Sequence, residues 1–94
     1  MKVKVKFFAH LSELTGKKPV FEVDVEEGAT VSMLLDSLLV DRRIRDALLD
    51  ENQEIRSNIT VLKNGREIKL LAGMETKLSH GDELAVFPML VGGR

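Results

Sequence analysis

Two short runs of alternating apolar and charged residues near the N-terminus constrain the fold most strongly. From Lys2 to Phe7, lysine alternates with valine and phenylalanine, and from Phe21 to Glu26 apolar residues alternate with Glu and Asp. A period of two predicts β-strands with one buried face. Because the outward charges are basic in the first run and acidic in the second, an antiparallel hairpin would set Lys opposite Glu or Asp. The segment between them, His10 to Lys18, lacks alternation, and Gly16 suits a turn with positive φ.

After Gly28 the apolar period changes from that of a strand to that of a helix. Thr30 is a suitable N-cap. The apolar positions that follow recur at i, i+3, i+4 and i+7, and they are Val31, Leu34, Leu35 and Leu38. We expect an amphipathic helix that ends near Val40. The same signal is weaker from Asp41 to Leu49, which predicts a second short helix or a single turn.

The second half of the chain contains further strand signals. Ile59 to Leu62 is a compact apolar run that leads to Asn64-Gly65, a dipeptide preferred in tight hairpin turns, so a return strand should follow. Leu70 to Lys77 has no clear period and is expected to be a surface loop. Glu83 to Phe87 predicts a last short strand, and Pro88 should prevent its continuation as a central strand.

This order of elements, with strands before and after the main helix, indicates an α+β fold in which one mixed sheet carries the helix across one face. If the last strand pairs in parallel with the first, the fold is a ubiquitin-like β-grasp. We expect this domain over residues 1–88 and a flexible C-terminal tail over residues 89–94. The length of 94 residues suits one domain of this kind.

Composition excludes several classes of function. The chain has no cysteine, which rules out disulfides, thiolate metal cages and a cysteine nucleophile. Its formal net charge of -1 provides no general basic field for nucleic acid or an anionic membrane, so a protein partner is expected. No apolar stretch approaches the roughly 20 residues of a membrane span, and the alternating start does not resemble a secretory signal. These features favour a cytoplasmic location.

An autonomous active site is not expected, because the sequence lacks phosphate-binding loops, HExxH and recognisable pairings of a nucleophile with histidine. The histidines are His10 and His80. In the parallel pairing, His10 follows the first strand and His80 precedes the last, so we expect two surface histidines at opposite ends of the sheet and no metal site.

The segment that contains Arg42, Arg43 and Arg45 also contains acidic residues between and beside them, which indicates a solvated mixed-charge segment. Contact of this segment with an acidic partner is the alternative.

The apolar residues that lead out of the domain are more informative. They are Phe87, Met89, Leu90 and Val91, and they lie on both sides of Pro88. Two interpretations are open: a terminal strand folded onto the core, or a tail that inserts into a groove of another protein. The Gly92-Gly93 pair that follows has no Cβ atoms, so it can pass through a channel too narrow for other residues.

Several segments carry a resemblance to a known family. They are residues 7–16 (FFAHLSELTG), the Asn64-Gly65 turn, and residues 78–88 (LSHGDELAVFP) followed by Gly92-Gly93. In one register over essentially the whole chain, they resemble the small subunit of molybdopterin synthase, which belongs with the ubiquitin-like sulfur carriers. Phe87-Pro88 before the tail is more similar to this subfamily than to the sulfur carriers of thiazole synthesis.

The resemblance implies a non-catalytic sulfur-carrier subunit whose reactive group is the carboxylate of Gly93. In the family, a ubiquitin-activating-type adenylyltransferase uses ATP to adenylate this carboxylate, and a sulfur donor displaces AMP. The resulting thiocarboxylate enters the large subunit of molybdopterin synthase and gives its sulfur to the pterin precursor of the molybdenum or tungsten cofactor. The same resemblance implies that Gly92 provides clearance and that the chain itself binds no cofactor. The residues that would guide the tail into its partner are Phe87, Pro88, Met89, Leu90 and Val91.

Two positions separate this sequence from that family. Met89 stands where a second proline is usual, and Arg94 follows the second glycine, at which the family usually ends. Activation of Gly93 therefore requires removal of Arg94.

Two functions are alternatives to sulfur transfer. One is a ubiquitin-like protein modifier joined through Gly93 to lysines of other proteins, which archaeal relatives of the family resemble. The other is a binding module that is never activated. A large synthase subunit encoded nearby would favour sulfur transfer, and slowly migrating lysine conjugates would favour modification.

Overall fold

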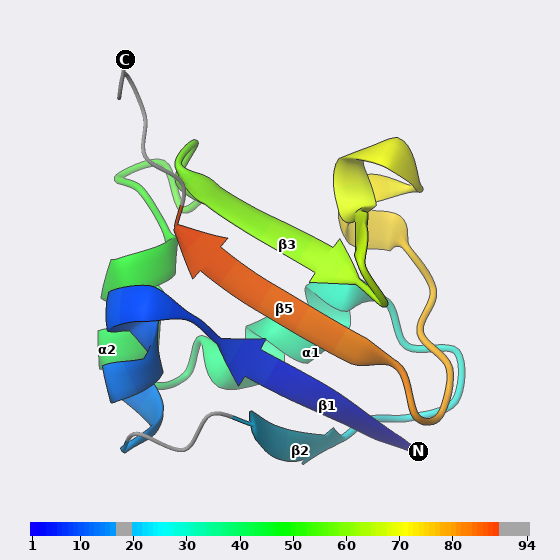
Figure 1. Cartoon of the computed structure of the whole chain (residues 1–94). Helices are drawn as coiled ribbons and strands as arrows, with labels where there is room; N and C mark the ends of the chain where they lie inside the picture. Colours follow the sequence, from blue (N-terminus) through cyan, green and yellow to red (C-terminus); the bar gives the residue numbers. More distant parts are fainter. Residues whose placement is uncertain (17–19, 89–94) are drawn as a thin grey trace.

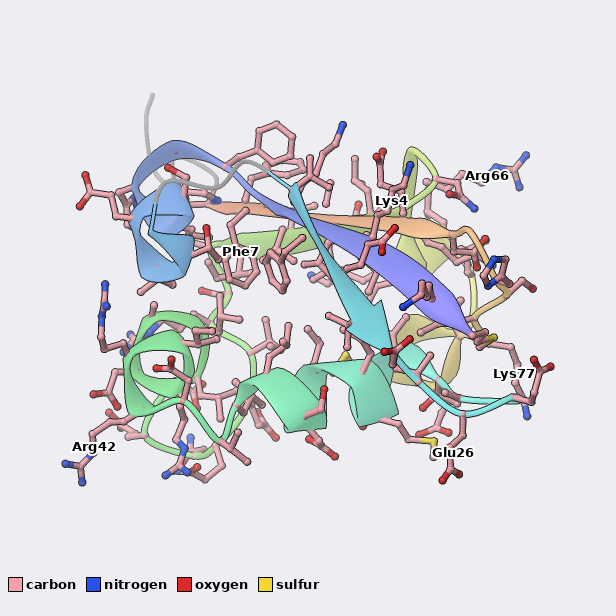
Figure 2. The ribbon with its side chains drawn as sticks, turned by 90° about the horizontal axis from the view of Figure 1, so that it is seen from below. Lys4, Phe7, Glu26, Arg42, Arg66 and Lys77 are labelled. Carbon is pink, nitrogen blue, oxygen red and sulfur yellow. The ribbon has the colours of Figure 1, made fainter. Side chains whose placement is uncertain are left out.

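The computed structural model describes residues 1–16 and 20–88, which form one mixed sheet with two α-helices on the same side of it (Figure 1, Figure 2). The predicted tail, residues 89–94, lies outside the described residues. The strands are β1 (Lys2–Phe7), β2 (Val20–Asp24), β3 (Ile59–Lys63), β4 (Arg66–Glu67) and β5 (Glu83–Pro88). The helices are α1 (Val31–Leu38) and α2 (Arg42–Leu48), with 3₁₀ turns η1 (Ala9–Thr15), η2 (Ile68–Leu70) and η3 (Gly73–Glu75).

The strand order across the sheet is β2-β1-β5-β3-β4. β1 is antiparallel to β2 and parallel to β5, which confirms the pairing on which the ubiquitin-like β-grasp depends. In the β1–β2 hairpin, Lys2 lies opposite Asp24 and Lys4 opposite Glu22, as the charge pattern predicts. The fold is therefore the expected α+β sheet with its main helix across one face.

The hydrophobic core lies between the sheet and α1. Thr30 is the N-cap of this helix, since its Oγ1 accepts a hydrogen bond from the Met33 N–H at 3.3 Å. The helix ends at Leu38, slightly earlier than the sequence predicts. The fully buried residues that join the helix to β1 and β5 are Val3, Val5, Val31, Leu34, Leu35, Leu84 and Val86. Removal of this apolar surface from water is the main stabilising contribution.

The second helix is confirmed as α2. Its N-cap is Asp41, whose carboxylate accepts hydrogen bonds from the backbone N–H groups of Arg43 and Ile44. Ile44 and Leu48 are buried one turn apart, which is the spacing of an apolar helix face. The weak sequence signal therefore marks an amphipathic helix and not an isolated turn.

Two connecting segments have more structure than the sequence predicts. The segment after β1 forms η1, which ends at Gly16 with a φ of +67° and buries Leu11 completely. The expected loop over residues 70–77 contains η3, and Thr76 next to it is buried, with its hydroxyl donating to the Gly73 carbonyl at 2.6 Å. A single buried residue in each segment produces no periodicity, so neither 3₁₀ turn has a sequence signal.

Pro88 belongs to β5, one residue beyond the predicted end of the strand, and, as the sequence predicts, it does not continue β5 as a central strand. It pairs with Ile59 of β3, while the β1–β5 pairing stops at Phe7 and Val86. The Phe8 N–H donates to the Val86 carbonyl at 3.0 Å, so Val86 directs its backbone toward β1, and alternation gives Pro88 the same direction. Because β1 has already ended there, the missing N–H of Pro88 costs no ladder hydrogen bond.

Candidate functional site

The end of β5 is the structural base of the predicted tail. β5 lies between β1 and β3 and is held from both sides as far as Val86, whereas Phe87 and Pro88 pair with β3 alone (Figure 1). Of the predicted site residues, Phe87 and Pro88 are described, and both are half-buried. Met89, Leu90, Val91, Gly92 and Gly93 lie outside the described residues.

Phe87 forms an aromatic pair with Phe8 at this end of the sheet. The ring centroids are 6.1 Å apart and the rings are inclined by 82°, an edge-to-face contact. Phe8 is 44% exposed, whereas its neighbour Phe7 is buried and contacts Phe21 on the helix side. Consecutive residues at the end of β1 therefore place one ring in the core and the other on the opposite surface, which we call the outer face.

The outer face is a mixed surface that surrounds the aromatic pair. Figure 2 shows Phe7 between the sheet and the helices and Lys4 on the other side of the sheet. On that side Lys6 forms a salt bridge with Glu83 at 3.2 Å, and both side chains are partly exposed. An aromatic pair beside a polar rim is the composition expected of a protein-binding surface.

The opposite end of β1 carries a separate charged pair. Lys2 Nζ is 3.1 Å from Asp24 Oδ1, and this hydrogen bond and the carboxylate charge raise the pKa of Lys2 above its ordinary value of 10.5. His80 lies beside Lys2, since its Nδ1 accepts a hydrogen bond from the Lys2 backbone N–H at 3.1 Å. These contacts secure the turn that leads into β5, at the end of the sheet away from Phe87.

The two histidines are placed as the sequence predicts. His10 is exposed in η1 beyond the end of β1, and His80 is exposed before the start of β5. In residues 1–16 and 20–88 there is no group of three or more His, Asp or Glu residues that could hold a metal ion.

Two arginines of α2, Arg43 and Arg45, make contacts within the fold. Arg43 donates from its guanidinium to the Glu13 carbonyl at 3.2 Å, which joins α2 to η1. Arg45 donates to the Leu39 carbonyl at 3.2 Å and so holds the end of α1. These contacts favour the prediction of a solvated mixed-charge segment over that of a docking patch.

Sequence reasoning did not select Phe8 as a site residue. A signal was present, because two adjacent phenylalanines in an alternating strand point to opposite faces, and only one of them can enter the core.

Sequence reasoning also did not predict a cavity of about 460 Å³ beside β3, since the residues that line it come from distant segments. Among the described helices none is long and apolar enough to cross a bilayer.

The combination of a β-grasp sheet, an exposed aromatic pair and a tail with Gly92-Gly93 agrees with comparisons to known families. The sequence profile of the ThiS family matches residues 5–93. The chain belongs to the ThiS family. The matched region includes the second half of β1 and all of α1 and β5, and the resemblance to ubiquitin-like sulfur carriers is confirmed.

Relatives in the ThiS family have two kinds of name. Small archaeal modifier protein 3 of Haloferax volcanii is 39% identical over 93 residues, which cover 99% of this chain and 100% of the relative. The molybdopterin synthase sulfur carrier subunit of Mycobacterium tuberculosis is 29% identical over 93 residues, with 99% of each chain covered. The chain is thus a member of a family of ubiquitin-like sulfur carriers and modifiers.

Solved structures of ThiS family relatives have the same fold. The crystal structure of SAMP1 from Haloferax volcanii superposes with a TM-score of 0.82 at 33% identity, covering 99% of this chain and 100% of that chain. A chain of the Amycolatopsis orientalis BexX/CysO complex superposes with a TM-score of 0.72 at 29% identity, covering 97% and 99%. That second structure is a complex, so a homologue of this chain binds a partner protein.

Proposed function

We propose that this chain is a ubiquitin-like carrier whose Gly93 carboxylate is activated by a ubiquitin-activating-type adenylyltransferase. The observation that supports this best is the position of β5. It is held on both sides as far as Val86 and ends at Pro88, next to the partly exposed pair of Phe8 and Phe87. From Pro88 to Gly93 the extended chain spans up to roughly 17 Å, which separates a docking surface from a distant reactive centre.

The proposed chemistry has two steps, adenylyl transfer to the carboxylate and then acyl transfer to a nucleophile. The Gly93 carboxylate oxygen attacks the α-phosphate of ATP, pyrophosphate leaves, and the acyl-adenylate that forms is a far better acyl donor than the carboxylate. A nucleophile then attacks the carbonyl carbon and AMP leaves. ATP binding and catalysis belong to the activating enzyme, so the chain needs no cofactor of its own.

Conjugation to lysine is the first of two fates for the activated glycine. A lysine amine attacks the carbonyl and forms an isopeptide bond, which makes the chain a protein modifier. The identity to a relative named as a modifier, 39% over nearly all of both chains, supports this fate.

Sulfur transfer is the second fate. A sulfur nucleophile replaces the adenylate, and the resulting thiocarboxylate serves the large subunit of molybdopterin synthase in molybdenum or tungsten cofactor biosynthesis. Support comes from the relative named as a molybdopterin synthase sulfur carrier subunit. The tail and the Phe8–Phe87 surface serve both fates, because each begins with the same activated glycine.

Mass spectrometry of the chain recovered from its native cells separates the fates. Modification predicts Gly93 attached to lysines in peptides of other proteins, whereas sulfur transfer predicts a free chain in which sulfur replaces one terminal oxygen. A chain shortened to end at Val91 is the matched control, since it keeps the domain and loses both glycines. If neither product is found in the native cells, and a chain that ends at Gly93 gives no ATP–pyrophosphate exchange with its cognate activating enzyme, the proposal is wrong.

A further inference from the structure

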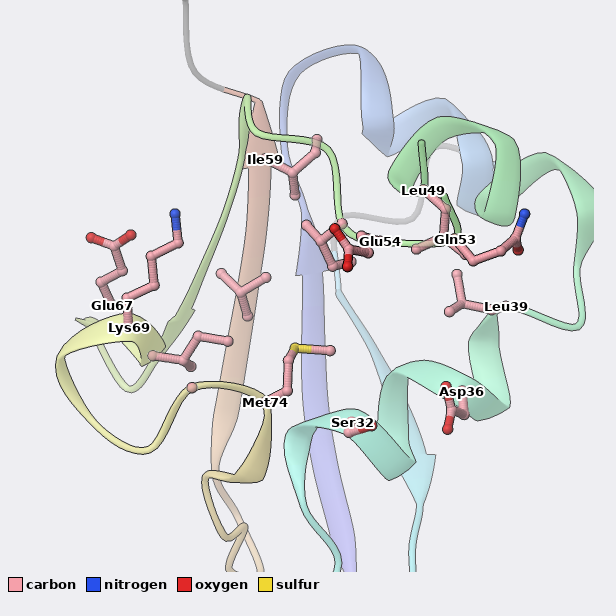
Figure 3. Close-up of a pocket in the computed structure, with 14 residues that line it drawn as sticks. Ser32, Asp36, Leu39, Leu49, Gln53, Glu54, Ile59, Glu67, Lys69 and Met74 are labelled. Carbon is pink, nitrogen blue, oxygen red and sulfur yellow. The ribbon is translucent and has the colours of Figure 1, made fainter. Parts of the chain in front are cut away.

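A second surface lies on the helix side of the sheet, at the edge formed by β3. A cavity of about 460 Å³ opens there between β3, α1, the loop before β3 and η3 (Figure 3). Its apolar lining includes Ile59, Val61, Leu49, Ile55, Ile68 and Met74. Figure 3 shows Met74 directed into the space from the η3 side. The cavity can therefore receive an apolar side chain from outside.

The edge of β3 beside this cavity has backbone groups available for pairing. In an antiparallel ladder, alternate residues direct their N–H and C=O groups to opposite neighbours. The Asn64 N–H donates to the Glu83 carbonyl of β5 at 2.8 Å, so Val61, an odd number of residues away, directs its backbone away from β5. On that side β4 pairs with Leu62 and Lys63 alone among the described residues. Because Leu62 faces β5, its pairing with Glu67 is made through the Val61 carbonyl and the Ile68 N–H. The groups left for an added strand are the Val61 N–H and, by the same alternation, the Ile59 carbonyl, since the Ile59 N–H already donates to Arg56.

The rim of the cavity is acidic. Asp36, Glu54 and Glu67 contribute carboxylates and Lys69 contributes the single ammonium group. Within residues 1–16 and 20–88, none of these carboxylates forms a salt bridge. Free carboxylates around an apolar floor are complementary to a segment that carries both apolar and basic side chains.

We propose that this groove binds an extended segment of a partner protein, which adds to the edge of β3 as a strand. One apolar side chain of the segment fills the cavity next to Val61, and flanking Lys or Arg side chains pair with Glu54 and the other rim carboxylates. Strand addition supplies affinity through the main chain, and the pocket and rim supply specificity.

This groove is separate from the surface around the tail. Val61 faces the helix side of the sheet and is buried, whereas its neighbour Thr60 lies opposite Phe87, which faces the other side. A segment in the groove would leave Phe8 and Phe87 uncovered. The chain can therefore hold this partner while its tail engages an activating enzyme or a transfer enzyme.

The test uses the isotope-labelled full chain and the probe peptide acetyl-Lys-Val-Leu-Val-Lys-amide, followed by NMR. We expect the largest amide shift changes at Val61 and around Met74. The Glu54→Lys variant should weaken binding by about fivefold or more, the effect of roughly 1 kcal/mol. The matched control is Glu51→Lys, because Glu51 is an exposed acid outside the cavity lining and should change binding by less than about twofold.

Three results would overturn the proposal. One is equal binding of the peptide in which both lysines are replaced by glutamate. Another is a set of shift changes centred on Phe8 and Phe87 instead of the groove. The third is a marked gain in peptide affinity on removal of residues 89–94, which would make the chain's own tail the occupant.

Discussion

The edge of one phenylalanine ring meets the face of another where Phe8, just past the end of β1, contacts Phe87, near the end of β5, with centroids 6.1 Å apart. The contact joins two strands that are parallel neighbours in the sheet and far apart in the sequence. It also places both rings at the end of the sheet where β5 reaches Pro88. The pair therefore lies at the end of the domain from which the chain leads into the predicted tail.

Truncation of the aromatic pair should weaken partner binding. Phe87→Ala, Phe8→Ala and Leu90→Ala should each reduce affinity for the activating enzyme by about 1–4 kcal/mol, because apolar anchors in desolvated pockets carry most interface energy. Lys4→Ala is the control, since Lys4 is an exposed residue of the outer face that lies opposite Glu83, at the start of β5 and away from Phe87. Isothermal titration calorimetry measures the difference. Unchanged affinity in all three aromatic and tail variants would show that this surface is not the anchor.

The packing of α1 on the sheet predicts a large cost for one core substitution. Leu35 is fully buried, so Leu35→Ala should lower the free energy of unfolding by about 2–5 kcal/mol through lost burial and a residual cavity. Ser37 is exposed on the same helix, and Ser37→Ala should have an effect within about 0.5 kcal/mol. Urea denaturation of both variants provides the comparison. Small and equal effects would contradict the role of α1 in the core.

Arg94 should block activation of Gly93. In-line attack on the α-phosphate tolerates little misplacement, since about 1 Å can cost 100-fold in rate, and one added residue extends the chain by up to roughly 3.6 Å. A chain that ends at Gly93 should therefore support ATP–pyrophosphate exchange with its cognate activating enzyme. A chain that still carries Arg94 should be inert until a protease removes the arginine. Equal exchange by both chains would show that a free Gly93 carboxylate is not required.

The Lys2–Asp24 pair predicts an effect at alkaline pH. Its hydrogen bond and charge raise the pKa of Lys2 above 10.5 in the folded protein. Because the folded pKa exceeds the unfolded one, the pair stabilises the fold below pH 10.5, and this contribution disappears as the pH rises through the raised pKa. Asp24→Asn should lower the pKa of Lys2 in an NMR titration, and Glu22→Gln should lower it less. A pKa unaffected by Asp24→Asn would contradict the assigned cause.

The sequence predicts the parts of the fold that repeat a period. The alternation of β1 and β2, the apolar face of α1 and the Asn64-Gly65 turn each leave a local signal, and the structure confirms all of them. The η1 and η3 turns left no signal, because each depends on one buried residue and on contacts to distant segments. The inclusion of Pro88 in β5 was not predicted for the same reason, since the effect of its missing N–H depends on where β1 ends.

The candidate site also has one part that the sequence predicts and another part that depends on contacts between distant segments. Phe87 could be identified from its position before the tail, but its contact with Phe8 depends on the parallel pairing of β1 and β5. The groove beside β3 could not be predicted, because its lining residues share no spacing in the sequence. The roles of Gly92 and Gly93 in the reactive end of the tail stay a prediction from the sequence.

The parallel pairing of β1 and β5 has a mechanical consequence. The chain enters the sheet at the start of β1 and leaves it at the end of β5, so a pull between the N-terminus and the tail slides these two strands past each other. In this shear direction the hydrogen bonds between the strands share the load, whereas strands that are peeled apart lose theirs one at a time. A force on the tail, such as that of an enzyme that drags the chain through a pore, would meet the most resistant part of the domain first.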